Sequence, residues 1–337
     1  MQVHNHFQLQ NFNTFNIKAL AKKFVAVHDV SDLKTVLANN QSETKFILGG
    51  GSNMLLTTDI DALVIHIDLK GKTITTETEN NVHVTCMAGE NWHDFVLWTL
   101  DHDFGGLENM SLIPGNVGTT PVQNIGAYGT EIKDTMVSCS ALNIKTLETK
   151  TFSNQDCNFG YRESVFKNEL KNQYIITAVT FQLTKKKHKI NHSYGDISAE
   201  LEKNHIVNPS IKNISDAIIA IRKSKLPDPK ELGNSGSFFK NPIISKQLFD
   251  QVRSSFPDIK NYPISETLVK VPAGWLIEQC GFKGKRFGDA GVHKNQALVL
   301  VNYGNATGQE ILDLSTKIQK TVFKKFGIAI EAEVNVV

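Results

Sequence analysis

The spacing of apolar positions in the first part of the chain predicts short strands separated by helices and turns. Three apolar runs have the length of buried strands: residues 24–27, 45–48 and 62–67. Ser31 is a residue type that begins helices, and we expect a helix from there to about Leu37. Residues 73–86 alternate between apolar and polar positions, as in a hairpin that turns at Asn80-Asn81. Helical spacing then follows at Trp92, Phe95, Val96 and Leu100.

The middle of the chain ends at a proline-rich break. Residues 174–183 form a long β-rich run, and residues 215–222 have the pattern of a short helix. The segment Leu226-Pro-Asp-Pro229 cannot continue that helix, because proline lacks the amide hydrogen and its ring clashes with the preceding turn. We therefore predict a domain boundary at this segment.

Beyond the break, the pattern predicts helices near 245–254 and 273–280 and a strand at 297–301. A long helix is expected over 308–326, and Gly327 should end it. Its inward positions have helical spacing: Ile311, Leu314, Ile318 and Phe326. The last apolar run, 328–337, predicts a strand. Because strands and helices are mixed without strict alternation, the predicted fold class is α+β.

The composition favours a cytoplasmic protein. Hydrophobic residues make up 40% of the 337, charged residues 21%, and the net charge is +2, so we expect no binding to nucleic acid or to a membrane surface. The cysteines form no CxxC pair and lie near no histidine cluster, which predicts free thiols and no metal site: Cys86, Cys139, Cys157 and Cys280. The N-terminus is polar, and no stretch approaches the roughly 18 apolar residues of a membrane span.

The first candidate for chemistry is a glycine-rich loop, Gly49-Gly-Gly-Ser-Asn53, directly after a predicted strand. Glycines allow backbone amides to approach an anion such as a pyrophosphate. The loop lacks the Gly-Lys-Ser/Thr of a Walker motif and the final glycine of GxGxxG, where Met54 stands. An ordinary turn therefore stays an alternative.

A second loop, residues 111–129, contains four glycines and two prolines. It also contains apolar residues that are unusual in a surface linker: Ile113, Val117, Val122 and Ile125. Such a loop must satisfy buried backbone groups, and a large polar ligand would do so. Neither loop contains cysteine or histidine, so a flavin held there would be bound non-covalently.

These loops and later motifs resemble the UDP-N-acetylenolpyruvoylglucosamine reductases of peptidoglycan synthesis, which have the FAD-binding fold of the vanillyl-alcohol oxidase (PCMH) type and a separate substrate-binding α+β domain. Tyr194-Gly-Asp196 resembles the loop of the type I branch. The matching segments run in family order: Gly49–Asn53, Ile113–Gly129, Tyr161–Lys167, Lys225–Pro229, Gly233–Pro242, Ala273–Gln279 and Glu331–Val334. Two departures are Asn13-Thr-Phe-Asn16, where glycine is usual, and the end Asn335-Val-Val337, where Arg-Phe usually follows Glu-Val.

The resemblance implies three parts. Residues 1–67, together with the C-terminal strand 328–337, form one FAD-binding subdomain, and residues 68–226 form a second. Residues 227–327 form the substrate-binding domain. It implies reduction of UDP-N-acetylglucosamine enolpyruvate to UDP-N-acetylmuramate through FAD, with NADPH as co-substrate. The sequence has no Rossmann motif that would indicate a separate site for NADPH. NADPH and the sugar nucleotide are therefore expected to use one site in turn. The oligomeric state stays open, and a monomer is the simplest expectation.

The resemblance also assigns roles to individual residues. Arg162 and Glu333 match the pair that polarises the substrate carboxylate, and Ser237 matches the proton donor. The residues matched to the UDP diphosphate and sugar are Tyr194, Lys225, Asn241 and Gln296. Those matched to FAD are Gly49, Gly50, Gly51, Ser52, Asn53, Ile113, Pro114, Gly115, Gly118, Thr119, Thr120, Gln123, Asn124, Ile125, Gly126 and Tyr128.

Other functions are weighed against this one. Ser237 with Lys240 fits the SxxK of serine acyl-transfer enzymes, but no partner motif accompanies it and the same spacing recurs elsewhere. Another flavoenzyme of the superfamily, such as a sugar or hydroxy-acid oxidase, is a second alternative, and a non-catalytic nucleotide-sugar binding protein a third. Each site residue also has a structural alternative, such as a turn serine at Ser237 or a surface ion pair at Arg162.

Overall fold

A computed structural model describes residues 2–337 and divides the chain into two compact units. The first unit consists of the chain up to Phe7, Ala21–Gly50 and Ile60–Arg222. The second consists of Gln8–Leu20, Gly51–Asp59 and Lys223–Val337. The three-part division expected from the sequence stays a prediction.

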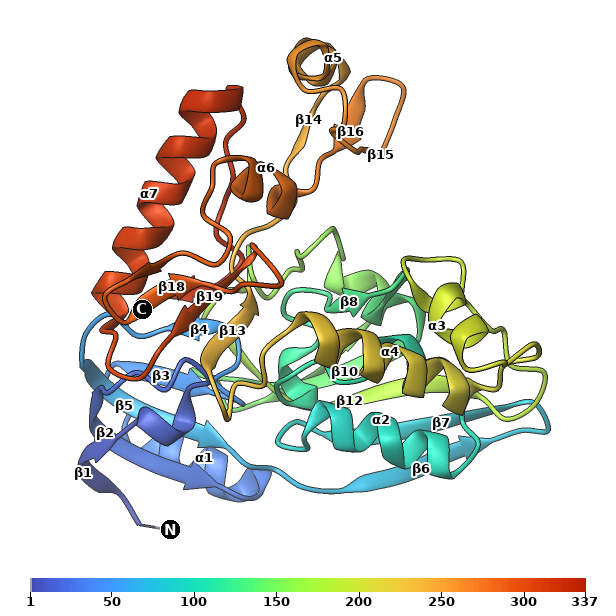
Figure 1. The fold of residues 1–337 in the computed structure, drawn as a ribbon. Coiled ribbons are helices and arrows are strands. Elements are labelled where there is room, and N and C mark those ends of the chain that lie inside the picture. Colours follow the sequence, from blue (N-terminus) through green and yellow to red (C-terminus); the bar gives the residue numbers. More distant parts are fainter. Residues whose placement is uncertain (1) are drawn as a thin grey trace. The chain divides into compact units, whose positions relative to one another are not determined.

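The first unit contains a four-stranded sheet with the order β1-β2-β5-β3, in which β5 pairs in parallel with β2 and with β3. Its core contains Val25, Leu33 and Ile65 at one face, beneath helix α1 (Val30–Asn39). The strands are β1 (His4–Gln8), β2 (Leu20–Val27), β3 (Lys45–Leu48) and β5 (Ile60–Ile67) (Figure 1).

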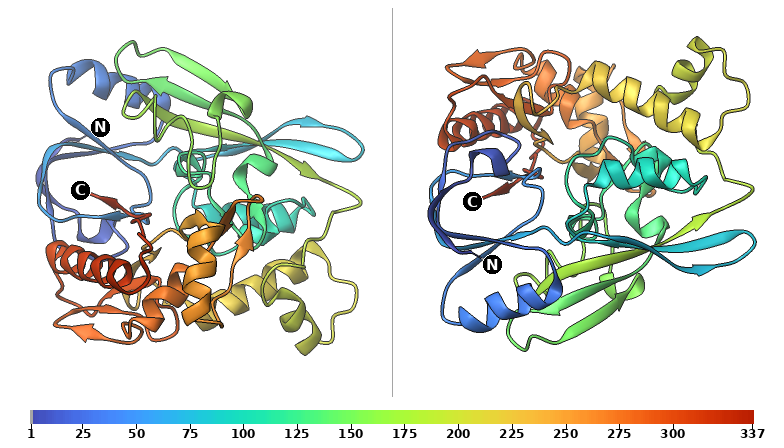
Figure 2. Two further views of the ribbon diagram at one scale, coloured as in Figure 1. Left: turned by 90° about the horizontal axis from the view of Figure 1, so that it is seen from above. Right: turned by 90° about the horizontal axis from the view of Figure 1, so that it is seen from below.

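The first unit also contains a five-stranded antiparallel sheet with the order β11-β10-β12-β7-β6. A two-stranded sheet is formed by β8 (Gly126–Ala127) and β9 (Thr130–Glu131). Helix α2 (Trp92–Asp101) buries Trp92 and Phe95 against Phe181 of this sheet. The β6–β7 hairpin is the pale-blue arm in both views of Figure 2. The strands are β6 (Lys72–Glu77), β7 (Asn81–Met87), β10 (Met136–Asn143), β11 (Thr149–Ser153) and β12 (Tyr174–Thr184).

Helices α3 (Ile197–Lys203) and α4 (Ile211–Lys225) share a separate apolar cluster, which includes Ile197, Ile214 and Ile218. The half-buried Tyr128 of the second glycine-rich loop packs against this cluster. The loop is therefore fixed to α3 and α4 by apolar contact.

The second unit contains an antiparallel sheet with the order β13-β19-β18-β17, and helix α7 (Gly308–Phe326) packs against β18 and β19 (Figure 1). A small antiparallel sheet, β14-β16-β15, packs against α5 (Lys246–Ser255). The other strands and the remaining α-helix of this unit are β4 (Met54–Leu55), β13 (Gly233–Ser237), β14 (Ile243–Ser245), β15 (Tyr262–Pro263), β16 (Leu268–Lys270), α6 (Ala273–Gln279), β17 (Arg286–Phe287), β18 (Ala290–Val292), β19 (Val299–Asn302) and β20 (Asn335–Val336).

Most of the predicted elements are present, and the α+β class is confirmed. Two local predictions are wrong. Helix α1 is capped by Asp29, whose carboxylate accepts the Asp32 N–H, and Ser31 lies inside the helix. Only Asn335–Val336 of the apolar run 328–337 forms a strand, because the rest of that run lacks a continuous partner strand. Within residues 2–337, none of the helices combines the length and apolar character needed to cross a bilayer.

Candidate active site

The two glycine-rich loops meet in the first unit. A Cβ atom on Gly49 would lie 2.7 Å from Cγ2 of Thr119. On Gly50 it would lie 2.8 Å from Oδ1 of Asn116 and 3.0 Å from Cα of Gly115. A side chain at Gly50 would require the backbone of the second loop to shift, and one at Gly49 would require the Thr119 side chain to move. The two segments predicted to bind FAD are therefore brought together as bare backbone.

The second loop is held by hydrogen bonds of its own. The N–H of Gly118 donates to the carbonyl of Ala88 over 2.9 Å, and the N–H of Val117 donates to that of Glu90 over 2.9 Å. A Cβ on Gly118 would lie 2.4 Å from Cβ of Ala88. We expected a ligand to satisfy the buried backbone of this loop, but the protein itself satisfies part of it. The loop is thus shaped before any ligand binds.

Backbone strain is concentrated around this loop. Leu112, Asn124, Tyr128 and Arg162 have φ values of 59°, 46°, 49° and 59°, in the left-handed region that non-glycine residues rarely adopt. Each such residue costs on the order of 1–3 kcal/mol and persists only where its surroundings impose the conformation. The side chain of Asn124 supplies part of that constraint, because it donates to Glu131 Oε2 and to the carbonyl of Gly160 and accepts the Lys133 N–H.

Arg162 is fixed to the second loop. Its Nη2 donates to the carbonyl of Gly126 over 2.7 Å, and its Nη1 donates to that of Asn124 over 3.3 Å. The guanidinium carbon lies 5.3 Å from the ring centroid of Tyr161. These contacts place a permanent positive charge at the end of the loop that is predicted to hold FAD.

Tyr194 contacts the same loop. Its ring meets the ring of Tyr128 edge-on, with centroids 6.5 Å apart and an interplanar angle of 89°. The side chain is 44% exposed, so it can contact a ligand. The first unit therefore gathers the first two residues of the Gly49–Asn53 loop, the second loop, Arg162 and Tyr194.

In the second unit, Ser237 at the end of β13 and Glu333 near the C-terminus belong to segments that are hydrogen-bonded to each other. Ser237 is the exposed last residue of β13, opposite Val299 of β19. The Glu333 N–H donates to the carbonyl of Phe238 over 2.8 Å, and Phe239 forms an antiparallel bridge with Ala332. Ser237, the predicted proton donor, is therefore adjacent in sequence to Phe238, whose carbonyl accepts the N–H of the predicted catalytic Glu333.

The other predicted substrate residues of this unit each form a local hydrogen bond. Oδ1 of Asn241 accepts the Ala273 N–H over 2.9 Å, at the start of α6. Oε1 of Gln296 accepts the Leu298 N–H over 3.3 Å. The backbone of Lys225 is hydrogen-bonded to the His293 side chain. Burial lowers the pKa of that histidine, whose Nδ1 is buried and has no partner within residues 2–337.

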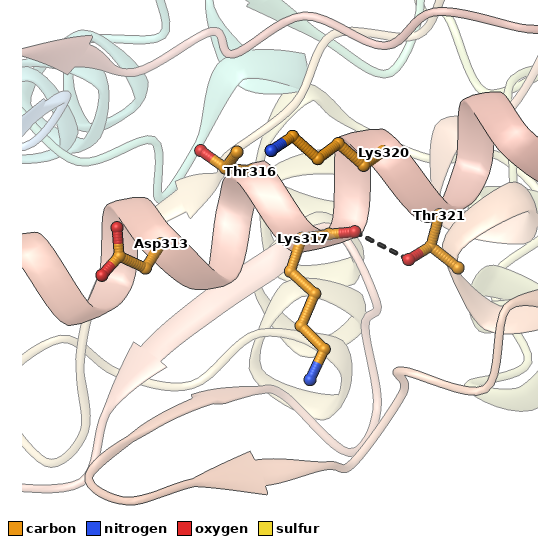
Figure 3. A pocket seen from close by; sticks show the side chains of 5 residues that line it. All are labelled: Asp313, Thr316, Lys317, Lys320 and Thr321. Atoms are coloured by element: carbon orange, nitrogen blue, oxygen red, sulfur yellow. Dashed lines mark hydrogen bonds between the residues drawn. The ribbon is translucent and has the colours of Figure 1, made fainter.

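A depression in the surface of α7 is lined by other residues (Figure 3). Lys317 and Lys320 leave the helix in different directions, and Oγ1 of Thr321 donates to the carbonyl of Lys317. The lining residues are Asp313, Thr316, Lys317, Lys320 and Thr321. None of them was predicted to belong to the site, and none belongs to the groups described above.

Comparison with known proteins covers most of the chain. Residues 21–145 match an FAD binding domain, and residues 228–337 match the C-terminal domain of UDP-N-acetylenolpyruvoylglucosamine reductase. The UDP-N-acetylenolpyruvoylglucosamine reductase of Flavobacterium johnsoniae is 72% identical over 337 residues, covering 100% of both chains. The chain belongs to this reductase family. The protein of the same name from Pseudomonas putida is 45% identical and covers 99% of both chains.

Solved structures share the fold. The UDP-N-acetylenolpyruvylglucosamine reductase of Thermus caldophilus has a TM-score of 0.69 at 22% identity, covering 100% of this chain and 99% of that chain. A VAO-type flavoprotein from Myceliophthora thermophila has a TM-score of 0.50 at 10% identity, covering 95% and 73%. These likenesses concern the fold alone. With the matched domains, they confirm the predicted vanillyl-alcohol oxidase type of FAD-binding fold.

As a member of the UDP-N-acetylenolpyruvoylglucosamine reductase family, the chain is an FAD-dependent oxidoreductase of peptidoglycan precursor synthesis. The predicted family and enzyme class are confirmed, and the acyl-transfer alternative is set aside. The roles assigned to individual residues stay predictions. No group of three or more His, Cys, Asp or Glu residues suited to a metal is found between residues 2 and 337.

One residue of the reductase's first unit was missed in the sequence. Nε of Arg222 on α4 is buried and has no hydrogen-bond partner within residues 2–337. Burial lowers the pKa of Arg222, and nearby Tyr128 has the opposite effect. The position of Arg222 in the helix was the available signal, since it lies four residues after Ile218, on the stripe that also contains Ile211 and Ile214.

Proposed function

We propose that the protein reduces the enolpyruvyl group of UDP-N-acetylglucosamine enolpyruvate to give UDP-N-acetylmuramate, with NADPH as reductant and FAD as hydride carrier. The reaction adds a hydride to C3 and a proton to C2, while negative charge develops on the substrate carboxylate. The observation that carries the proposal is the pairing of Glu333 with Phe238 beside Ser237, in a chain of this family. The cytosolic location, the preference for NADPH and the monomeric state stay predictions.

The glycine-rich loops fit an FAD held without a covalent bond. Gly49 and Gly50 present backbone where side chains would not fit, as close approach to a pyrophosphate requires. The buried Nε of Arg222 is a donor that an oxygen of such a ligand would satisfy. When bound, FAD would supply the hydride chemistry between NADPH and the enolpyruvyl group.

Arg162 is proposed to bind the substrate carboxylate. A guanidinium stays charged at any working pH and its planar fork matches a carboxylate. The bonds to Gly126 and Asn124 hold the group in place before substrate arrives. Little reorganisation is then needed when negative charge develops, which is the condition under which electrostatic stabilisation is most effective.

Ser237 is proposed to give the proton to C2. A serine hydroxyl is a weak acid, but it can protonate a carbanion-like carbon within hydrogen-bond reach. Its exposed position at the end of β13 makes the hydroxyl accessible to a ligand. Glu333 would act on the carboxylate with Arg162, either protonated or sharing a proton with the substrate.

Tyr194, Lys225, Asn241 and Gln296 are proposed to hold the UDP-sugar. The amide oxygens of Asn241 and Gln296 already accept backbone N–H groups. Their amide nitrogens are therefore the groups that would donate to phosphate or hydroxyl oxygens. Lys225 would act on the diphosphate as a point charge.

Isotope labelling of the product tests the proposed function. The FAD-reconstituted protein is incubated with the enolpyruvyl substrate, first with NADPH deuterated at C4 and then with ordinary NADPH in D2O. We expect the NADPH-derived deuterium at C3 and never at C2. In D2O we expect deuterium at C2, and also at C3 to the extent that the N5–H of the reduced flavin exchanges with solvent before transfer. Parallel double-reciprocal lines should accompany turnover, because NADPH and substrate would use one site in turn. NADPH consumption that yields hydrogen peroxide and unchanged sugar nucleotide would instead indicate an oxidase.

A further inference from the structure

The end of the chain is hydrogen-bonded to the segment that follows the first glycine-rich loop. Strand β20 pairs in parallel with β4, with Asn335 opposite Met54 and Val336 opposite Leu55. The Val337 N–H donates to the carbonyl of Leu55 over 2.9 Å. The loop therefore continues into a strand whose partner is the C-terminus.

Asn335 adds a side-chain contact to this pairing. Its backbone N–H donates to the carbonyl of Asn53 over 3.2 Å, and its Nδ2 donates to the same oxygen over 2.9 Å. One carbonyl oxygen has two lone pairs, so both bonds can form together. In return, Nδ2 of Asn53 donates to the carbonyl of Glu333 over 3.4 Å. Asn53 is thus bonded to the C-terminal segment on both sides of Val334.

These bonds connect two residues with different predicted roles. Asn53 is the last residue of the loop assigned to FAD, and Glu333 is assigned to catalysis. Asn53, Glu333 and Asn335 all belong to the second unit.

We propose that Asn335 is a positioning residue, whose side-chain amide holds the Asn53 peptide in register with Glu333. The inference rests on the proposed function, since it takes Asn53 to contact FAD and Glu333 to act on substrate. When the amide is removed, the Asn53 carbonyl retains only one backbone donor from the C-terminal segment. The position of Asn53 relative to Glu333 is then less restricted, although neither residue is itself changed.

The test compares Asn335→Ala and Asn335→Asp with the wild type. Both variants lack the donor, and aspartate preserves the shape of the side chain. FAD is titrated into each apo-protein, and reduction by NADPH and reoxidation by the enolpyruvyl substrate are measured separately. We expect the FAD Kd to rise about tenfold and reoxidation to slow about tenfold, the order of effect of one hydrogen bond. Reduction by NADPH of the FAD-saturated variants should change less than twofold, because the affected glutamate acts in the other half-reaction.

Two matched variants separate positioning from general loosening of the strand. Val336→Ala leaves every backbone bond of β20 in place, so FAD affinity should equal that of the wild type. Thr57→Val removes the 2.8 Å bond from the threonine hydroxyl to the carbonyl of Val337 without touching Asn53. It should lower the unfolding temperature without changing the FAD Kd.

The outcomes distinguish this inference from the proposed function. If the wild type binds FAD and both Asn335 variants bind it equally well, the positioning role is wrong and the proposed function stands. A loss of affinity in Thr57→Val equal to that in Asn335→Ala also overturns the inference, because strand fraying then explains both. If the wild type binds no FAD, the proposed function itself fails. Should one Asn335 variant not fold, the other decides.

Discussion

The backbone N–H of Glu333 donates a 2.8 Å hydrogen bond to the carbonyl of Phe238, the residue that follows Ser237. These residues are nearly a hundred positions apart in the sequence. The bond belongs to an antiparallel contact that also joins Lys240 to Glu331, so the two segments are in fixed register. A serine and a glutamate assigned to one reaction are therefore supported by a single piece of β structure.

Lys225 tests the proposed binding of the diphosphate. We expect Lys225→Ala to raise KM for the sugar nucleotide about 10- to 100-fold with a smaller change in kcat, since a lysine facing phosphates is an electrostatic contact. Steady-state kinetics at saturating NADPH measure both constants. Lys223→Ala is the matched control, because Lys223 is exposed on the same helix and has no assigned role. An equal increase in KM for both variants would indicate a general charge effect.

Gly50 tests the contact between the glycine-rich loops. A Cβ there would lie 3.0 Å from Gly115 Cα, so Gly50→Ala should displace the second loop and weaken FAD binding at least tenfold, as measured by titration of the apo-protein. Gly51→Val is a poorer test, because Gly51 has φ of 59° and its Cβ would lie 2.0 Å from the carbonyl oxygen of Phe12. That substitution would disturb folding as well as FAD binding.

Gly327→Ala is the control for Gly50→Ala. Gly327 ends α7 with φ of 66°, and a Cβ there would meet nothing within 4 Å. The substitution should cost about 1 kcal/mol of stability through backbone strain alone. FAD affinity that falls equally in both variants would show that loss of stability, and not loop contact, governs binding.

Glu108 predicts a pH dependence of stability. Burial raises the pKa of this carboxyl above its ordinary value of 4.5, against the opposing effect of the Gly106 N–H, which donates to it over 2.6 Å. The native state therefore binds more protons than the unfolded state above pH 4.5, and this group's contribution to stability is lost as the pH rises through its native pKa.

In Glu108→Gln the titration is absent. The free energy of unfolding of the variant, relative to that of the wild type, should therefore increase from about pH 4 to pH 8. Urea unfolding of both proteins at several pH values measures this difference. Glu202→Gln, at an exposed position, is the matched control. A flat difference for Glu108→Gln would mean that the Glu108 pKa is not raised.

The sequence predicted those elements whose ends carry their own local signals. Helix α7 has the ends that were predicted, and Gly327 adopts the left-handed conformation expected of a residue that ends a helix. The structure adds a capping box of Thr307 and Glu310 at the other end. Asp29 and Ser31 are both capping residue types, and spacing alone could not choose between them. Strand β20 is short because its extent depends on β4, which lies far away in the sequence. Local pattern contains no information about such a partner.

The same distinction holds for the site. Motifs named the glycine-rich loops, and the structure brings Gly49 and Gly50 against residues 115–119 as such a site needs. Arg222 and Asn335 were missed because their significance comes from burial and from a long-range hydrogen bond. Neither property can be read from the residue type or from its immediate neighbours.

The most direct test of the account is a stopped-flow comparison of Ser237→Ala with the wild type. We predict that NADPH reduces the flavin of the variant at close to the normal rate, because that step does not need the hydroxyl. Reoxidation by the enolpyruvyl substrate should slow on the order of 10²- to 10⁴-fold, the usual effect of a positioned acid, and Ser237→Cys should recover part of the loss. Ser254→Ala, at an exposed position on α5, should change neither step. If Ser237→Ala slows reduction by NADPH as much as reoxidation, the hydroxyl is structural and the proton comes from another group.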